Sequence, residues 1–203
     1  MAAVAGRHRL LLLVDRTTSK GKRLDPSSWL KGARGEEAVG RILAGLRQDG
    51  YRDLHDIETG KGNIDHVVVG PTAVVAVETK HWTGTFSSVN GDLRFNRRPC
   101  PDVLKQAQRG AMEIRRRLER ASVRTFVDAV VVPTNAAVVE GELSFRQAAA
   151  LEASRLEGWI RSRRHRLTDA EFARAVAAIL RGDAAVSVQA ISHEGARHDG
   201  SPL

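Results

Sequence analysis

Two acidic residues lie at the facing ends of neighbouring apolar segments. Asp65 comes just before an apolar run that ends at Val69, and Glu78 lies near the end of the apolar stretch 73–80. Residues 70–72 (Gly-Pro-Thr) predict a tight turn, and a hairpin closed there pairs residues whose numbers sum to 143. Asp65 is then directly opposite Glu78, where like charges repel each other. Two such carboxylates require a cation between them or a proton on one of them.

Lys80 adds an ammonium group to this pair. Side chains alternate along a strand, so Glu78 and Lys80 share one face, while His66 points to the other face as a structural histidine. The set suits metal-assisted phosphodiester hydrolysis, and oxygen ligands favour Mg²⁺ or Mn²⁺. The metal would polarise the phosphate and lower the pKa of a bound water, and Lys80 would orient that water or offset developing charge. The alternative is a surface hairpin with an ordinary Glu-x-Lys pair.

A third carboxylate, Glu36, lies on a predicted helix over residues 33–48. At 100° per residue Glu36 borders the apolar stripe of this helix, whereas Glu37 faces water and has Arg41 as its partner one turn later. Glu36 therefore borders the core and is a candidate third carboxylate. The alternative is a first-turn carboxylate that is favoured by the helix dipole.

The remaining patterns predict an α/β fold with a mixed sheet. Residues 1–30 form a basic N-terminal extension in which residues 26–28 are a break, and residues from about 182 form a loose tail. After residue 140 the chain is expected to be mostly helical. Strands are predicted at 51–57, 64–69, 73–80, 84–89, 93–96 (around an Asn-Gly turn) and 126–132, and further helices at 102–121, 152–164 and 169–181.

Arginine dominates the positive charge of the chain. Lys and Arg total 32 against 24 Asp and Glu, a net charge of +8, and 26 of the 32 are arginine. The arginine guanidinium matches phosphate geometry, so a nucleic-acid partner is plausible, although a solvated helix face explains the same residues. The candidate phosphate-binding residues are Arg94, Arg97, Arg98, Lys105, Arg109 and Arg116, with Arg115, Arg117, Arg120 and Arg124 nearby.

Three stretches of the chain together resemble a known family. They are Gly32-x-x-Gly35-Glu36, the string 62–71 (Gly-Asn-Ile-Asp-His-Val-Val-Val-Gly-Pro) and 77–80 (Val-Glu-Thr-Lys). This set is similar to the nuclease-related domain, NERD, of the PD-(D/E)xK superfamily, over about residues 31–139. The resemblance implies a restriction-endonuclease-like core, with a mixed central β-sheet flanked by helices and extra C-terminal helices.

The resemblance also implies roles for individual residues. Asp65 and Glu78 would ligate the metal with the main-chain carbonyl of Thr79, Lys80 would be the catalytic lysine, and Glu36 would lie near the metal. Gln106 would be the helix glutamine that faces the site. Family members often carry Asn-Pro before this glutamine and Asn after the lysine, and this chain departs from both patterns, so Gln108 is a rival.

These inferences predict a divalent-metal-dependent nuclease that hydrolyses DNA, with RNA as the weaker alternative substrate. The second hypothesis is a catalytically inactive module that binds nucleic acid or protein. We expect the nuclease-like domain at residues 31–140, a C-terminal helical region at 141–182 and a tail at 183–203. No apolar run approaches the roughly 18 residues of a membrane span, and a single cysteine excludes a disulfide framework, so we expect a cytoplasmic protein. A homodimer, or a partner protein that supplies other activities, stays open.

Overall fold

The computed structural model describes residues 26–60, 62–165 and 167–181. Its helices are α1 (Pro26–Gly45), α2 (Pro101–Arg120), α3 (Leu156–Arg161) and α4 (Asp169–Arg181), with short 3₁₀ segments at Leu46–Asp49, Val139–Gly141 and Ala153–Arg155. Its strands are β1 (Arg52–Thr59), β2 (Gly62–Val69), β3 (Val74–Lys80), β4 (Gly84–Val89), β5 (Asp92–Phe95), β6 (Arg98–Pro99), β7 (Asp128–Pro133), β8 (Ala136–Val138), β9 (Glu142–Phe145) and β10 (Ala148–Leu151). Residues 1–25 of the predicted extension 1–30 and the predicted tail 183–203 lie outside the described residues.

A mixed six-stranded sheet in the order β1-β2-β3-β7-β10-β9 forms the centre of the molecule. β1, β2 and β3 pair antiparallel, β7 lies parallel to β3, and β10 lies parallel to β7. The sequences of β3 and β7 are nearly continuous apolar runs because both of their faces are buried. A smaller sheet of β6-β5-β4-β8 lies beside the central one.

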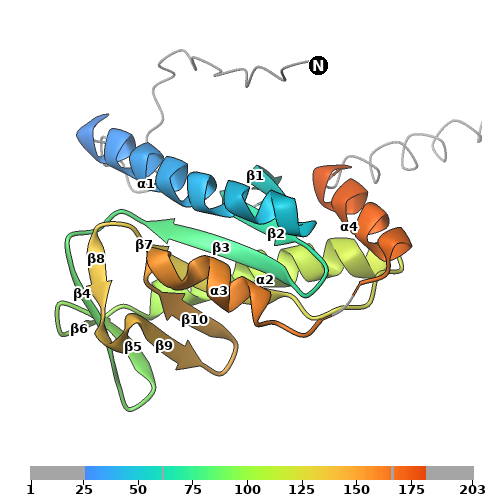
Figure 1. The fold of residues 1–203 in the computed structure, drawn as a ribbon. Coiled ribbons are helices and arrows are strands. Elements are labelled where there is room, and N and C mark those ends of the chain that lie inside the picture. The colour runs from blue at the N-terminus through green and yellow to red at the C-terminus, as the bar shows by residue number, and fades with distance from the viewer. Residues whose placement is uncertain (1–25, 61, 166, 182–203) are drawn as a thin grey trace, which may run out of the picture.

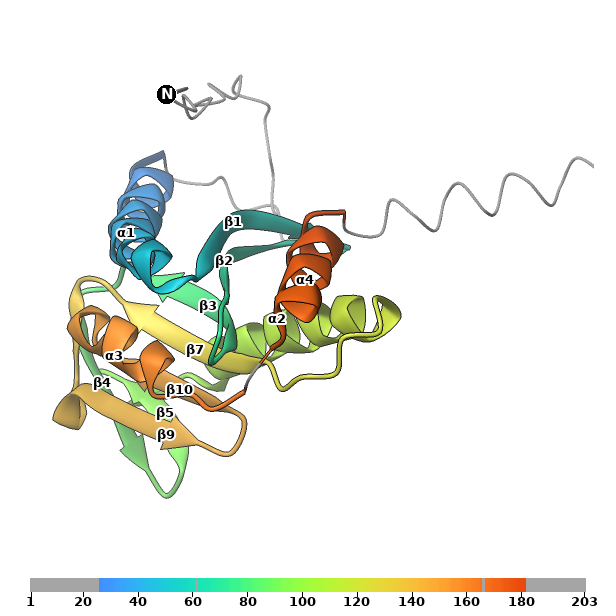
Figure 2. The same ribbon diagram turned by 45° about the vertical axis from the view of Figure 1, so that its right-hand side comes forward.

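Helices cover both faces of the central sheet, as Figures 1 and 2 show. Side chains of α1 and α3, among them Leu43 and Ile160, pack with Val75 and Val130 on one face. The other face is covered by α2 and α4, whose packing includes the fully buried Ile114. The fold is therefore α/β with a mixed sheet between helical layers, as the sequence predicted. Within the described ranges, no helix has both the length and the apolar character that a bilayer span needs.

Local sequence signals explain where several elements begin and turn. A proline stands at the first position of α1 and of α2, where its fixed φ suits a helix start and no amide hydrogen is needed. The break predicted at 26–28 is thus the first turn of α1, inside the predicted extension. At the β4–β5 turn, Asn90 and Gly91 have φ values of 53° and 81°, the left-handed pair that this hairpin requires.

The chain after residue 140 differs from the prediction. The expectation of a helical region is wrong for its first part, where β9 and β10 complete the central sheet. Ala149 pairs with Val130 of β7, so the strand conformation depends on a partner far away in sequence. The helix predicted at 152–164 is reduced to a 3₁₀ turn followed by α3, whereas α4 has the predicted bounds. The strand predicted at 126–132 begins at Asp128.

Candidate active site

β3 presents the core of the site at its carboxyl end. Glu78 and Lys80 point to the same side, and the Lys80 Nζ donates hydrogen bonds to Glu78 Oε1 at 2.5 Å and to Gln106 Oε1 at 3.1 Å. Glu78 is only 5% exposed. Gln106 comes from the second turn of α2, which packs against this end of β3. A buried carboxylate, an ammonium and an amide thus meet from two elements that are separate in sequence.

The hairpin of β2 and β3 brings Asp65 to this cluster. Its register is the predicted one, since His66 pairs with Val77 and Val67 with Ala76, and each pair sums to 143. One step further along this register, Asp65 is opposite Glu78. Asp65 Oδ2 accepts a hydrogen bond of 2.7 Å from the main-chain N–H of Thr79. The hairpin therefore sets the two carboxylates beside each other, as the sequence indicated.

The electrostatics of the pair show a surplus of negative charge. Burial, followed by the repulsion of Asp65, raises the pKa of Glu78 to about 7, against the opposing effect of Lys80. Burial also raises the pKa of Asp65, although the Thr79 N–H and Lys80 favour its ionised form. One ammonium group is too little to hold both carboxylates at their ordinary pKa values. A further cation would do so.

Glu36 reaches the same site from α1. Although it is exposed to solvent, partial burial raises its pKa, and the charges of Asp65 and Asp56 raise it further while Lys80 lowers it. A close approach of α1 permits this, because a Cβ on Gly35 would lie only 2.9 Å from Thr134 Oγ1 and 3.0 Å from the Cβ of His81. On the outer side of the helix Glu37 pairs with Arg41 at 2.7 Å, as predicted.

Asp56 is a site residue that the sequence reasoning missed. It has a φ of +52° and interrupts the ladder between β1 and β2, which pairs His55 with His66 and Ile57 with Ile64. Its carboxylate accepts a 2.5 Å hydrogen bond from the side-chain amide of Asn63 and raises the pKa of Asp65. Only the β1–β2 register, which the sequence pattern did not provide, places Asp56 across from Asp65.

His66 lies on the opposite face, as predicted, and belongs to a separate polar chain. Its ring Nδ1 lies 2.8 Å from Nδ1 of His55, whose Nε2 lies 3.0 Å from Asp53. Asp53 in turn accepts two hydrogen bonds from Arg47. Burial, with help from His55, lowers the pKa of His66 to about 4. This histidine is therefore neutral at pH 7 and faces α1 at Gly40, away from Glu78.

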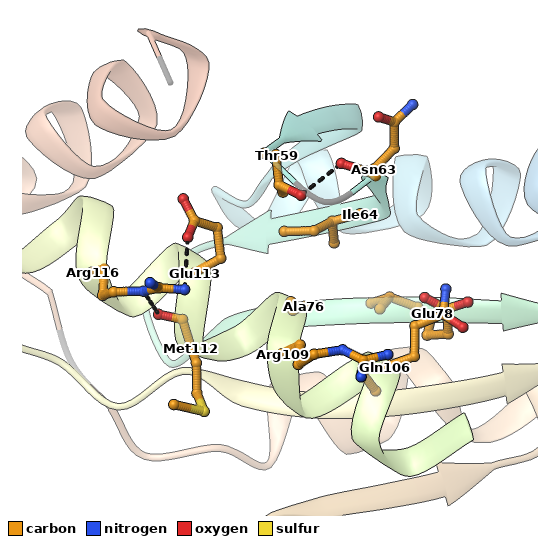
Figure 3. Close-up of a pocket in the computed structure, with 15 residues that line it drawn as sticks. Thr59, Asn63, Ile64, Ala76, Glu78, Gln106, Arg109, Met112, Glu113 and Arg116 are labelled. Carbon is orange, nitrogen blue, oxygen red and sulfur yellow. Dashed lines mark hydrogen bonds and ion pairs between the residues drawn. The ribbon is translucent and has the colours of Figure 1, made fainter. Parts of the chain in front are cut away.

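A cavity of about 480 Å³ opens between the β1–β2 hairpin, β3 and α2 (Figure 3). Glu78 and Gln106 line one end, and Arg109 and Arg116 line its α2 side. Gln108 does not line it, so the geometry favours Gln106 as the glutamine that faces the site. The cavity thus connects the acidic cluster to two of the predicted phosphate-binding arginines.

The other predicted basic residues are dispersed. Lys105 is exposed and lies 3.6 Å from Asp102, outside the cavity. Arg94, Arg97 and Arg98 lie on and after β5, where Arg94 donates to the carbonyl of Arg97. Arg117 is 4% exposed and bonds to the carbonyls of Ile179 and Glu58 and to Glu113, so it is a structural residue and cannot bind phosphate.

The donor set for a metal is small. Among the described residues, no three His, Cys, Asp or Glu side chains lie close enough together to hold an ion by themselves. Asp65 and Glu78 offer two carboxylates, and Mg²⁺ commonly binds through one or two carboxylates while it keeps several waters. The surplus negative charge and the all-oxygen donors fit such an ion.

A comparison with protein families identifies the chain. The sequence model of the nuclease-related domain, NERD, matches residues 31–134. The chain belongs to this family. No curated protein and no solved structure matches it. The NERD match includes Glu36, Asp65, Glu78, Lys80 and Gln106, all of the residues that meet at the end of β3. It ends before β9 and β10, although both strands belong to the central sheet.

Proposed function

We propose that this NERD chain is a divalent-metal-dependent nuclease that hydrolyses DNA phosphodiester bonds. The observation that carries the proposal is the pair of half-buried Asp65 and buried Glu78, with Lys80 Nζ at 2.5 Å from Glu78. The nuclease-related family supports a reaction on nucleic acid. The chain's positive charge and the arginines along the cavity support a polyanionic substrate.

Each residue of the site has a distinct role in the proposed reaction. Asp65 and Glu78 hold Mg²⁺ or Mn²⁺, with the Thr79 carbonyl as a further donor. The ion supplies Lewis-acid polarisation of the phosphate and lowers the pKa of a water. Lys80 orients the attacking water and offsets charge that develops on the phosphate. Gln106 fixes the position of the Lys80 ammonium, and Glu36 adds negative charge on the α1 side of the site.

A cleavage assay tests this function. Supercoiled and linear DNA are each incubated with the wild-type protein, Asp65→Asn or the control Asp92→Asn. Each reaction contains Mg²⁺, Mn²⁺ or EDTA. Asp92 is exposed on β5, so its variant matches the chemical change at a distance from the site. We expect cleavage that requires the metal, falls by about 100-fold or more in Asp65→Asn and is unchanged in Asp92→Asn.

The competing function is a NERD module that binds nucleic acid without turnover. The absence of a three-ligand cluster among the described residues favours it. Two results together would establish this function instead. The wild-type protein would bind DNA in EDTA, with an affinity that falls steeply with salt, and it would cut neither supercoiled nor linear DNA with Mg²⁺ or Mn²⁺. Equal cleavage by wild type and Asp65→Asn would place any activity elsewhere.

A further inference from the structure

The cavity beside Glu78 has the size and lining of a ligand pocket. Its volume of about 480 Å³ lies in the range of roughly 300–1,000 Å³ that small-molecule pockets have. Ile64 and Ala76 form an apolar wall on β2 and β3, and Ala107 and Met112 line the α2 side. Met112 is 61% exposed, so part of this apolar lining lies open to solvent.

Arg109 supplies a cation that is available to a ligand. Of the two arginines in the cavity, Arg116 is 2.9 Å from Glu113 in an ion pair. The side chain of Arg109 has no ion-pair or hydrogen-bond partner among the described residues, and the residue is exposed. In Figure 3 its side chain extends toward the end of the cavity at Glu78 and Gln106. A phosphate near Glu78 would therefore find a free guanidinium beside it.

The walls limit what can enter. At Gly110 an added Cβ would already touch Ile64 at 3.4 Å, so α2 and β2 approach each other closely along the cavity. A base-paired duplex is far wider than this space, whereas a single extruded nucleotide is the size of the ligands that such pockets hold. An apolar wall with one cation at its end suits the face of a base and the adjacent phosphate.

We propose that this cavity receives one unpaired nucleotide of the DNA strand, next to the phosphodiester that lies at Glu78. The inference rests on the proposed nuclease function and specifies its substrate as DNA with a single-stranded end or segment. Met112 and Ile64 contact the base, and Arg109 binds the phosphate next to the one at Glu78. A nucleotide that is already unpaired enters without the cost of breaking its base pair and stack.

Binding in EDTA tests the proposal separately from turnover. Fluorescence anisotropy of the full chain is measured with a labelled DNA hairpin that carries a single-stranded tail and with the same hairpin made blunt. We expect the tailed hairpin to bind about tenfold more tightly, which corresponds to one base stacked in the cavity. Equal affinities for the two hairpins would overturn the proposal.

Two variants and one control connect the preference to the cavity. Arg109→Ala should weaken binding of the tailed hairpin by about tenfold and that of the blunt hairpin much less. Arg115→Ala removes the same charge from α2 outside the cavity, where Arg115 pairs with Glu119, and should weaken both hairpins equally. Gly110→Leu places a side chain against Ile64 in the cavity, so it should remove the preference, and the Tm of the variant checks that the fold tolerates the added side chain.

The outcomes separate this proposal from the nuclease function. A preference for the tail that persists in both Arg109→Ala and Gly110→Leu would overturn the role of the cavity. If the protein cuts blunt and tailed DNA at equal, metal-dependent rates and binds both equally, the nuclease function is retained and the binding of an unpaired nucleotide in the cavity is refuted. If both variants remove the preference for the tailed hairpin and the wild-type protein cuts no DNA, the role of the cavity is retained and the nuclease function is refuted.

Discussion

Substituting Glu78 by glutamine should stabilise the metal-free protein at neutral pH. Glutamine keeps the shape of the protonated carboxyl but carries no charge. The pKa of Glu78 rises from 4.5 to about 7 on folding, with burial as the main cause. A shift of this size corresponds to about 3 kcal/mol, because each pKa unit is about 1.4 kcal/mol. Glu78 is only 5% exposed, so screening by solvent does not reduce this value much.

The sign of the effect follows from proton binding. Between pH 4.5 and 7 the folded protein holds the Glu78 proton more tightly than the unfolded chain, so the free energy of unfolding falls as pH rises through this window. His66 acts in the opposite direction, because its pKa falls from 6.5 to about 4 on folding and the unfolded chain binds more protons there. Both proteins contain His66, so its contribution cancels in the difference between their free energies of unfolding.

The assay is urea unfolding in EDTA at several pH values for wild type, Glu78→Gln and the control Glu37→Gln, an exposed carboxylate on α1. We expect the free energy of unfolding of Glu78→Gln to equal that of wild type near pH 4.5 and to be about 3 kcal/mol larger above pH 7. Mg²⁺ or Mn²⁺ at about 100 times its Kd should add about 2.7 kcal/mol to wild type and much less to Glu78→Gln. A pH-independent difference between the two proteins, or a less stable Glu78→Gln at pH 7.5, would refute the raised pKa.

Three further substitutions test the packing around the site. Arg117→Met should lower the free energy of unfolding in urea by about 2–4 kcal/mol, since it leaves two carbonyls without their donor and removes one of the two cations that pair with Glu113. The control Arg116→Met, at an exposed position, should lower it by less than about 0.5 kcal/mol. Gln106→Ala should reduce the cleavage rate by about 10–100-fold because Lys80 loses its second acceptor, and Gln108→Ala should leave the rate near that of wild type. Gly70→Ala should lower the urea midpoint by the equivalent of about 1–3 kcal/mol, because the new methyl group overlaps the ring of a buried tyrosine.

The acidic core could be predicted because it depends on local geometry. The turn at residues 70–72 fixes the β2–β3 register, and with strand alternation this places Asp65, Glu78 and Lys80 together without knowledge of any distant contact. The helix stripe likewise separated Glu36 from Glu37. Their roles as ligands and catalytic groups stay predictions, since they concern a metal and a substrate.

The errors lie where a distant partner determines the conformation. The alanine-rich segment of β10 has a composition that favours helix, and it becomes a strand through its pairing with β7 and β9. Arg117 looked like part of a basic helix face, but it is buried because α4 and the end of β1 supply two carbonyl acceptors. Neither the register of a parallel strand nor the acceptors for a buried guanidinium can be read from helix or strand periodicity.

Charge balance at the end of β3 favours one of the two interpretations that the sequence left open. An ordinary Glu-x-Lys pair has one cation for each anion and, on a surface, contributes little to stability. Here Lys80 shares its surroundings with Glu78 and Asp65, and Glu36 lies close enough for its pKa to respond to both Asp65 and Lys80. The negative charge of buried Glu78 and half-buried Asp65 is costly when it is taken out of water without full compensation. Burial is the first cause of the raised pKa values of Glu78, Asp65 and Glu36, and repulsion between carboxylates adds to it, so a divalent cation at the carboxylates would lower these pKa values. The imbalance, rather than the Glu-x-Lys pattern, is the feature that supports a hydrolytic site.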